Sequence, residues 1–180
     1  MTSQEIGQWV RNWMKTHPGC KDLTEMYDAF DNIKDNVVDI GRLTELIWGM
    51  HPLNYMSYIT DHMFTGYTDL TSISIPNHID VIGRGAFYNC NQLTNVELPR
   101  NIMRIEDYTF EGCSSLSRIT IPSGVRYIGI NAFYRCDSLA DIVFNGTKEE
   151  WNKIRKGRNW ISRKNKVFVH CSDGITNLIH

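Results

Sequence analysis

The sequence lacks both kinds of segment that would direct a chain to a membrane. Its first residues show no basic stretch followed by an apolar core, which argues against a secretory signal. No run approaches the roughly 18 apolar residues that a membrane-spanning helix requires. We therefore expect a cytoplasmic protein with no membrane partner, and we keep association with a virus particle as an alternative.

The chain has five cysteines in 180 residues, too few for a dense disulfide framework. An odd number without an export signal predicts reduced thiols rather than a disulfide framework. Cys90, Cys113 and Cys136 recur at intervals of 23 residues, so they would stack in a straight ladder. Because zinc needs ligands that converge on one point, we interpret this ladder as packing and expect neither a metal nor a cofactor.

Motifs that carry catalysis are missing as well. The sequence has no paired carboxylates at catalytic spacing, no glycine-rich phosphate loop, no H-E-x-x-H and no nucleophile elbow. Its six histidines show neither metal nor triad spacing. His170 and Cys171 are adjacent, but neighbouring strand residues point to opposite faces, which argues against a nucleophile pair. We therefore do not expect an enzyme.

The net charge of −1 hides an asymmetry between the two ends of the chain. Residues 1–69 carry ten acids and five bases, whereas residues 146–170 carry eight bases and two acids. Opposite charges at the two ends could pair between chains, and a symmetric homodimer is one closed arrangement that would allow it. Two solvated faces of a single chain are the simpler interpretation.

The basic run near the C-terminus interleaves with Trp151 and Trp160, a combination that suits single-stranded nucleic acid. It consists of Lys153, Arg155, Lys156, Arg158, Arg163, Lys164 and Lys166. The same tryptophans could instead fill the end of a folded unit. We favour that interpretation and do not expect nucleic acid as the main partner.

What the sequence has in abundance is internal repetition. The chain enters one 23-residue pattern at Leu70, at Leu93 and at Leu116, and begins it again at Leu139. The matching columns are Leu70/Leu93/Leu116/Leu139, Ile73/Val96/Ile119/Ile142, Ile75/Leu98/Ile121/Phe144, Pro76/Pro99/Pro122, Ile82/Ile105/Ile128, Phe87/Phe110/Phe133 and Cys90/Cys113/Cys136. Such register over three periods predicts an array of stacked coils, with residues 47–69 as a degenerate entry repeat.

One period can be interpreted physically. In L-x-x-I-x-I the apolar residues alternate, which predicts a strand with one buried side. Proline then ends the strand because it has no N–H to donate. The next I-x-x-I is a second short extended or turn-like stretch, and A-F-x-x-C returns the chain with phenylalanine in the interior. Coils stacked at about 4.8 Å would bury these residues against each other.

The repeats resemble the BspA-like subfamily of leucine-rich repeats, whose pattern is roughly L-x-x-I-x-I-P-x-x-V-x-x-I-G-x-x-A-F-x-x-C. The second repeat departs from it at Glu106 and Thr109, where the family prefers glycine and alanine. The resemblance covers about residues 54–174 and excludes residues 1–46. It implies a right-handed solenoid with a parallel sheet on one face, protein–protein recognition often at host or microbial surfaces, and no catalytic residues.

The N-terminal part, residues 1–49, is predicted to be helical. Thr2-x-x-Glu5 and Asp22-x-x-Glu25 resemble capping boxes, and each precedes apolar residues at helical spacing. A third helix is expected from about residue 36 to 48. Three short helices would form a cap on the first coil or a separate docking domain, and we favour the cap.

The C-terminal part is expected to close the array. Thr147-x-x-Glu150 is a further capping box, and Trp151 and Ile154 mark one face of a short helix. Residues 166–170 predict a final strand that closes the sheet edge, because an open edge invites aggregation. The tail also resembles the terminal unit that follows the last repeat in the family.

The expected fold class is therefore α+β: a leucine-rich-repeat solenoid with an N-terminal helical cap or small helical domain. We place the helical segment at residues 1–49 and the solenoid at residues 50–180. The units of the solenoid are the degenerate repeat 47–69, the repeats 70–92, 93–115 and 116–138, and a C-terminal capping unit at 139–174.

Candidate binding residues are those that face outward on the predicted strands. The strongest set combines Arg, Tyr and Met, residue types that are enriched in interfaces. This set comprises Arg104, Arg126, Tyr127, Met103 and Tyr58 on the second stretch. A second set on the first strand of each repeat comprises Asn95, Glu97, Arg118 and Asp141.

These observations predict a non-catalytic protein–protein interaction module that acts as an adaptor or an inhibitor of a protein partner inside the cell. Its small size would suit a phage or mobile-element product. The alternative is a structural or attachment component of a virion or cell surface, docked through the N-terminal helices. A nucleic-acid-associated protein that binds through the basic C-terminal unit is a third hypothesis.

Overall fold

The computed structural model describes residues 58–75, 77, 79–162 and 166–177. All of these lie in one compact unit, Met56–His180. The predicted N-terminal helices and the predicted boundary at residue 49 fall outside the described residues, and both stay predictions. In the described part of the chain the only α-helix has six residues, so the helical share of the α+β class has no support there.

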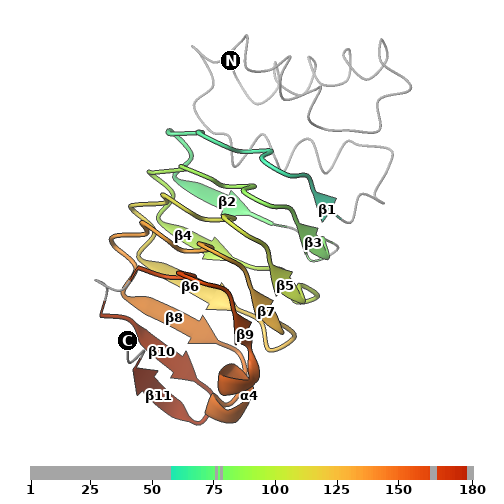
Figure 1. Ribbon diagram of the computed structural model, residues 1–180, viewed down its shortest axis with the longest axis vertical. Coiled ribbons are helices and arrows are strands. Elements are labelled where there is room, and N and C mark those ends of the chain that lie inside the picture. Colours follow the sequence, from blue (N-terminus) through green and yellow to red (C-terminus); the bar gives the residue numbers. More distant parts are fainter. Residues whose placement is uncertain (1–57, 76, 78, 163–165, 178–180) are drawn as a thin grey trace. The chain divides into compact units, whose positions relative to one another are not determined.

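The described residues form a solenoid in which successive coils stack along one axis (Figure 1). The large sheet runs in the order β11-β10-β8-β6-β4-β2, and all its strands pair in parallel except β10 with β11. Its strands are β2 (Ser72–Ser74), β4 (Asn95–Glu97), β6 (Arg118–Ile121), β8 (Asp141–Phe144), β10 (Phe168–Cys171) and β11 (Gly174–Asn177). The predicted solenoid with a parallel sheet is confirmed.

A second set of parallel strands lies on another side of the coils, at the right of Figure 1. Of the two options for I-x-x-I, extended and turn-like, the extended one is therefore correct. The strands form a pair, β1 with β3, and a three-stranded sheet in the order β5-β7-β9. They are β1 (Tyr58–Ile59), β3 (Val81–Ile82), β5 (Arg104–Ile105), β7 (Tyr127–Ile128) and β9 (Arg155–Lys156).

Strand register confirms the period and shows where it ends. Asn95 on β4 pairs with Arg118 on β6, which lies 23 residues further along the chain. The hydrogen bond from the Thr94 side chain to the backbone oxygen of Thr71 spans the same 23 residues. After the third repeat Tyr127 pairs with Arg155, which lies further along the chain than one period. The extra residues include helix α4 (Lys148–Lys153), which lies at the end of the stack in Figure 1.

The core is a set of ladders, one residue per coil, of which the phenylalanine ladder is the largest. Phe64, Phe87, Phe110 and Phe133 are all 0 % exposed. Their ring centroids lie 5.2, 5.3 and 5.5 Å apart, with interplanar angles of 6°, 3° and 3°. One residue type at one position per coil thus becomes a continuous aromatic stack, which fixes the coils in register.

At the position of Glu106 the neighbouring repeats place glycine close to the backbone of the preceding coil. A Cβ on Gly129 would lie 2.5 Å from the backbone nitrogen of Asp107, whose carboxylate accepts a 2.7 Å bond from Ile130 N. Gly83 meets Asp61 in the same way. In the coil before Glu106 the residue that corresponds to these aspartates is Arg84. Gly157, however, faces Ile130 rather than an aspartate, and a Cβ there would lie 2.6 Å from Ile130 N. The close backbone approach favours glycine with or without the aspartate, and nothing in the structure explains Glu106.

The second departure, Thr109, is a buried hydroxyl with a partner. Its side chain is 0 % exposed and Oγ1 donates to the backbone oxygen of Glu106 at 2.9 Å. A buried hydroxyl that keeps a hydrogen bond avoids most of its desolvation cost. Threonine can therefore replace alanine in this coil without opening the core.

The C-terminal unit follows the prediction with one correction. Thr147 and Glu150 form the expected capping box on α4, and Trp151 is 2 % exposed against Phe144, with ring centroids 5.4 Å apart. The strand predicted at residues 166–170 is present and extends the sheet beside β8, but its bounds differ and it is not the last strand. The strand spans Phe168–Cys171, and β11 returns antiparallel to it because Gly174, at φ +122°, permits a tight turn.

Candidate interaction surface

The large sheet presents a mixed and scattered set of polar side chains. Asn95, Glu97 and Arg118 are exposed, as predicted from strand alternation. Asp141 is only half-exposed because its Oδ1 lies 2.6 Å from Nε2 of His170 on the adjacent strand β10. Four of the predicted residues therefore share one sheet, but one of them is already paired within the chain.

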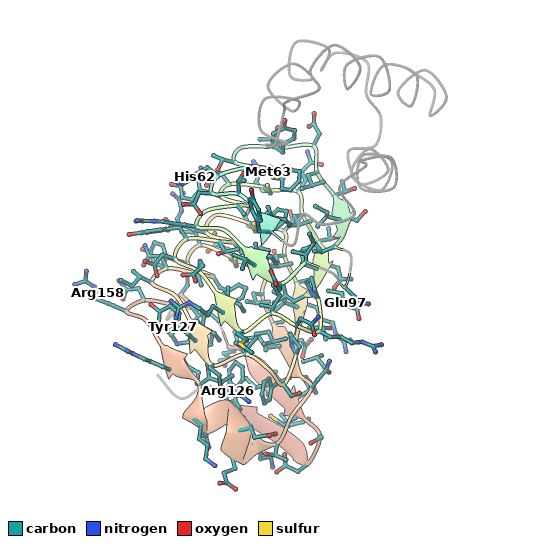
Figure 2. All side chains as sticks on the ribbon, turned by 90° about the vertical axis from the view of Figure 1, so that its right-hand side faces the viewer. His62, Met63, Glu97, Arg126, Tyr127 and Arg158 are labelled. Atoms are coloured by element: carbon teal, nitrogen blue, oxygen red, sulfur yellow. The ribbon has the colours of Figure 1, made fainter. Side chains whose placement is uncertain are left out.

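The second set of strands carries a more coherent column. Tyr58, Val81, Arg104 and Tyr127 occupy its successive coils, and β9 extends it by one coil with Arg155. Arg104 and Arg155 are exposed, and Tyr127 between them is partly exposed. Figure 2 looks onto this face and labels Arg126 and Tyr127 on it, with Glu97 on the opposite side of the view.

Met103 and Arg126 stand beside this column, each one residue before its strand. Met103 is 66 % exposed, the largest value among the exposed large apolar side chains. Arg126 is exposed too, and its Nη1 donates to the backbone oxygens of Ser123 and Val125 at 2.6 and 3.1 Å. These bonds hold one end of the guanidinium and leave its other N–H groups directed elsewhere.

Arg104 is held in place by two neighbours. Its Nε donates to Glu106 at 2.6 Å, and this hydrogen bond raises the pKa of the guanidinium above its usual value. The guanidinium carbon also lies 4.4 Å from the ring centroid of Tyr127. The Tyr127 hydroxyl in turn points to Asp107 at 3.4 Å. Arginine, tyrosine and carboxylates thus form one ordered cluster across two coils.

Two adjoining hollows mark this face. The first, of about 660 Å³, is lined by Asp80, Val81 and Arg100 among others. The second, of about 490 Å³, is lined by Met103, Arg104, Arg126, Tyr127 and Arg155. Met103 and Arg104 line both, so the hollows follow one another along the strands β3, β5, β7 and β9. We call the two together the arginine groove.

Four of the five residues that line the second hollow were predicted from the sequence, whereas Arg100 in the first hollow and the place of Arg155 in the second were not. Arg155 was assigned to the basic run, because α4 separates it from Tyr127 by more than one period. Arg100 follows Pro99 in the turn and belongs to none of the predicted strand columns. The capping box predicts a helix between Tyr127 and Arg155, and the extra residues of that helix would have shown that the 23-residue spacing no longer applies to Arg155. No comparable signal marked Arg100.

The described residues of the basic run have different surroundings. Arg163 and Lys164 lie outside the described residues. The Lys156 ammonium donates to the backbone oxygens of Trp151 and Ile154, and burial lowers its pKa. Lys153 pairs with Glu149 at 2.6 Å, whereas Arg158 and Lys166 are exposed. Trp151 packs against Trp160 with centroids 6.1 Å apart, so the tryptophans fill the last coil as we favoured.

The cysteine ladder is a packing feature, as interpreted. Cys90, Cys113 and Cys136 are 0 % exposed, and each thiol donates to a phenylalanine oxygen in the preceding coil at 3.0–3.1 Å. Burial raises the pKa of Cys90 to about 12 and raises the pKa of the other two as well. Within the described ranges, no group of three or more His, Cys, Asp or Glu is placed to hold a metal ion.

This ladder gives a first prediction. At pH 8 and without denaturant, the three ladder thiols should react with iodoacetamide far more slowly than Cys171, which is partly exposed. The thiolate is the reactive form, and a raised pKa keeps these thiols protonated until well above pH 8. Mass spectrometry of the cysteine peptides measures the rates. Equal labelling of Cys113 and Cys171 in the folded protein would contradict the prediction.

The comparisons with known proteins agree with the geometry. A family model described as "BspA type Leucine rich repeat region" matches residues 52–173 with six copies. The chain belongs to this family. No curated protein matches the chain. In the part of the BspA-type chain that the structure describes, no helix is long and apolar enough to cross a membrane.

Three solved structures resemble this BspA-type chain. A leucine-rich repeat protein of Bacteroides ovatus has a TM-score of 0.53 and 27% identity, over 63% of this chain and 28% of that one. The leucine-rich repeat protein of T. pallidum has a TM-score of 0.49 and 31% identity, over 56% of this chain and 44% of that one. A leucine rich cell surface protein of Faecalibacterium prausnitzii has a TM-score of 0.46 and 31% identity, over 55% of this chain and 32% of that one. This chain spans less than half the length of each.

Proposed function

We propose that this BspA-type chain is a non-catalytic protein-binding module that recognises its partner through the arginine groove. The observation that carries the proposal is the lining of the second hollow, in which three arginines, one tyrosine and one exposed methionine gather across successive coils. Arg, Tyr and Met are among the residue types that are enriched in protein interfaces. The regular backbone of stacked coils holds them in fixed positions, which lowers the entropy lost on binding.

Within that role we propose an adaptor or inhibitor that acts on a protein partner inside the cell. The test is an affinity pull-down from the native host with the full chain as bait, followed by mass spectrometry. We expect the unaltered chain to recover a partner at stoichiometric yield. The chain in which Met103 and Tyr127 are both replaced by alanine should not recover it. Recovery of no protein at stoichiometric yield would contradict the proposal.

A structural or attachment component of a cell surface or virion is the second candidate. The observation that favours it is the similarity to a protein described as a leucine rich cell surface protein. In this case residues 1–46 would dock to the assembly and the repeats would face outward. Deletion of residues 1–46 should then abolish incorporation while the repeats stay folded, and incorporation of the shortened chain would argue against it.

Two further arrangements follow from charge. A homodimer through the acidic N-terminal and basic C-terminal parts would dissociate as salt rises, which sedimentation at low and high salt measures. A nucleic-acid role through the basic run has less support, because Lys156 and Trp151 are engaged within the chain. Salt-dependent binding of single-stranded DNA would be needed to favour it.

A further inference from the structure

The arginine groove has an unequal distribution of charge along its length. In the first hollow, Asp80 and Glu106 accompany Arg100 and Arg104. In the second hollow, Arg104, Arg126 and Arg155 meet no acidic side chain among the lining residues. Of these three, Arg104 already pairs with Glu106. The end of the groove on β7 and β9 is therefore the cationic end.

Arg126 and Arg155 have no carboxylate partner among the described residues. The Arg126 side chain is bound only to the backbone oxygens of Ser123 and Val125, which carry no net charge to neutralise it. The two arginines come from adjacent coils, since Arg155 N donates to the oxygen of Arg126 at 3.1 Å. Two guanidinium groups on neighbouring coils thus lie on the same hollow.

A partner that covers this hollow must neutralise both arginines. Burial of an unpaired charge is strongly unfavourable, whereas an arginine that meets a carboxylate gains a charge-assisted and often bidentate hydrogen bond. The exposed Met103 lies between the two hollows and offers an apolar contact beside the charges. A complementary ligand therefore carries carboxylates next to an apolar side chain.

Single-stranded nucleic acid fits this surface less well. It is bound mainly by free aromatic faces on which bases stack. The aromatic ring in the second hollow is that of Tyr127, and the guanidinium of Arg104 lies over it at 4.4 Å. The ring already has a cation on its face, so the groove favours carboxylates over bases.

We propose that the arginine groove binds an acidic segment of a protein, with carboxylates on Arg126 and Arg155 and an apolar side chain on Met103. This inference rests on the proposed protein-binding function and specifies the chemistry of the partner. The segment lies across β5, β7 and β9 and runs along the axis on which the coils stack (Figures 1 and 2).

The test uses the full chain and a fluorescently labelled synthetic peptide rich in glutamate that contains one leucine. Fluorescence anisotropy at low salt should show binding that weakens as salt rises. The pair of substitutions Arg126→Glu and Arg155→Glu should lower the affinity about tenfold or more, because two attractive contacts become repulsive. The pair Arg126→Gln and Arg155→Gln should lower it less, because charge is removed without being reversed.

Two controls make the result specific. Arg135→Glu changes charge on the coil of β7, but Arg135 lines neither hollow of the groove, so this variant should keep the affinity within about twofold. A peptide with glutamine in place of glutamate should not bind. Circular dichroism and melting curves check that every variant is folded. An equal loss with Arg135→Glu, or equal binding of the glutamine peptide, would overturn the proposal.

The two proposals fail separately. The peptide measurements decide the chemistry of the groove, and the pull-down decides whether the chain has a protein partner. A partner that is recovered equally by the doubly charge-reversed chain would leave the protein-binding role standing and overturn the acidic segment at Arg126 and Arg155. A groove that binds the acidic peptide in a chain that captures no partner would remove the support for the adaptor or inhibitor role.

Discussion

Replacement of Phe110 by alanine is expected to lower the free energy of unfolding by about 3–5 kcal/mol. Phe110 is fully buried and stacks on both Phe87 and Phe133, at 5.3 and 5.5 Å. The substitution removes the apolar surface of one ring, leaves a cavity and interrupts contact with two coils at once. In a solenoid each coil is stabilised mainly by its neighbours, so a break in the middle weakens both sides.

Urea denaturation followed by circular dichroism measures this loss. The matched control is Phe168→Ala, the same substitution at a ring on strand β10 that is 46% exposed. It should cost only about 1–1.5 kcal/mol, because about half of this side chain already faces water. Similar costs for the two variants would show that the phenylalanine ladder is not the main element of the core.

Trp151→Ala is expected to have an effect of the same size, about 3–5 kcal/mol. The indole is 2 % exposed and contacts Phe144 and Trp160, with centroids at 5.4 and 6.1 Å. The Lys156 ammonium lies 4.6 Å from the ring centroid. Loss of the ring would uncover the last coil and expose apolar residues that have no further coil to cover them.

The control for Trp151 lies beside it on the same helix. Asn152→Ala changes an exposed residue of α4 and should alter stability by about 0.5 kcal/mol or less. The Trp151 variant should also bind a hydrophobic dye such as anilinonaphthalene sulfonate more strongly, because apolar surface is exposed. A Trp151 variant as stable as the Asn152 variant would mean that α4 does not cap the solenoid.

The interior of the protein could be predicted from the sequence almost residue by residue. Each buried ladder repeats one residue type at one spacing, and that spacing predicts which side chains stack, as for Phe87, Phe110 and Phe133. The capping box at Thr147 and Glu150 was equally predictable, because both of its hydrogen bonds are local. The end of strand β10 could not be predicted in this way, because the turn at Gly174 depends on a backbone conformation rather than on apolar periodicity.

The candidate site was only partly predictable. Arg104, Arg126, Tyr127 and Met103 follow from the repeat, because a fixed period places outward-facing residues in columns. Arg155 does not follow, because the helix α4 breaks the period before it. Nor could the sequence show that Asp141 is paired with His170, or that Arg104 covers the ring of Tyr127. These pairings depend on rotamers and on distances between coils.

The sequence by itself therefore determined the family, the 23-residue period and the buried ladders, because these depend on spacing along the chain. Only the tertiary structure decided which exposed residues act together. Arg155 reaches the coil next to Tyr127 after a helical insertion, and Arg126 and Arg155 come to lie on one hollow without a carboxylate between them. The physical reason is that a repeat fixes what must be hidden from water, whereas the charge of a surface depends on which side chains meet once the coils are stacked.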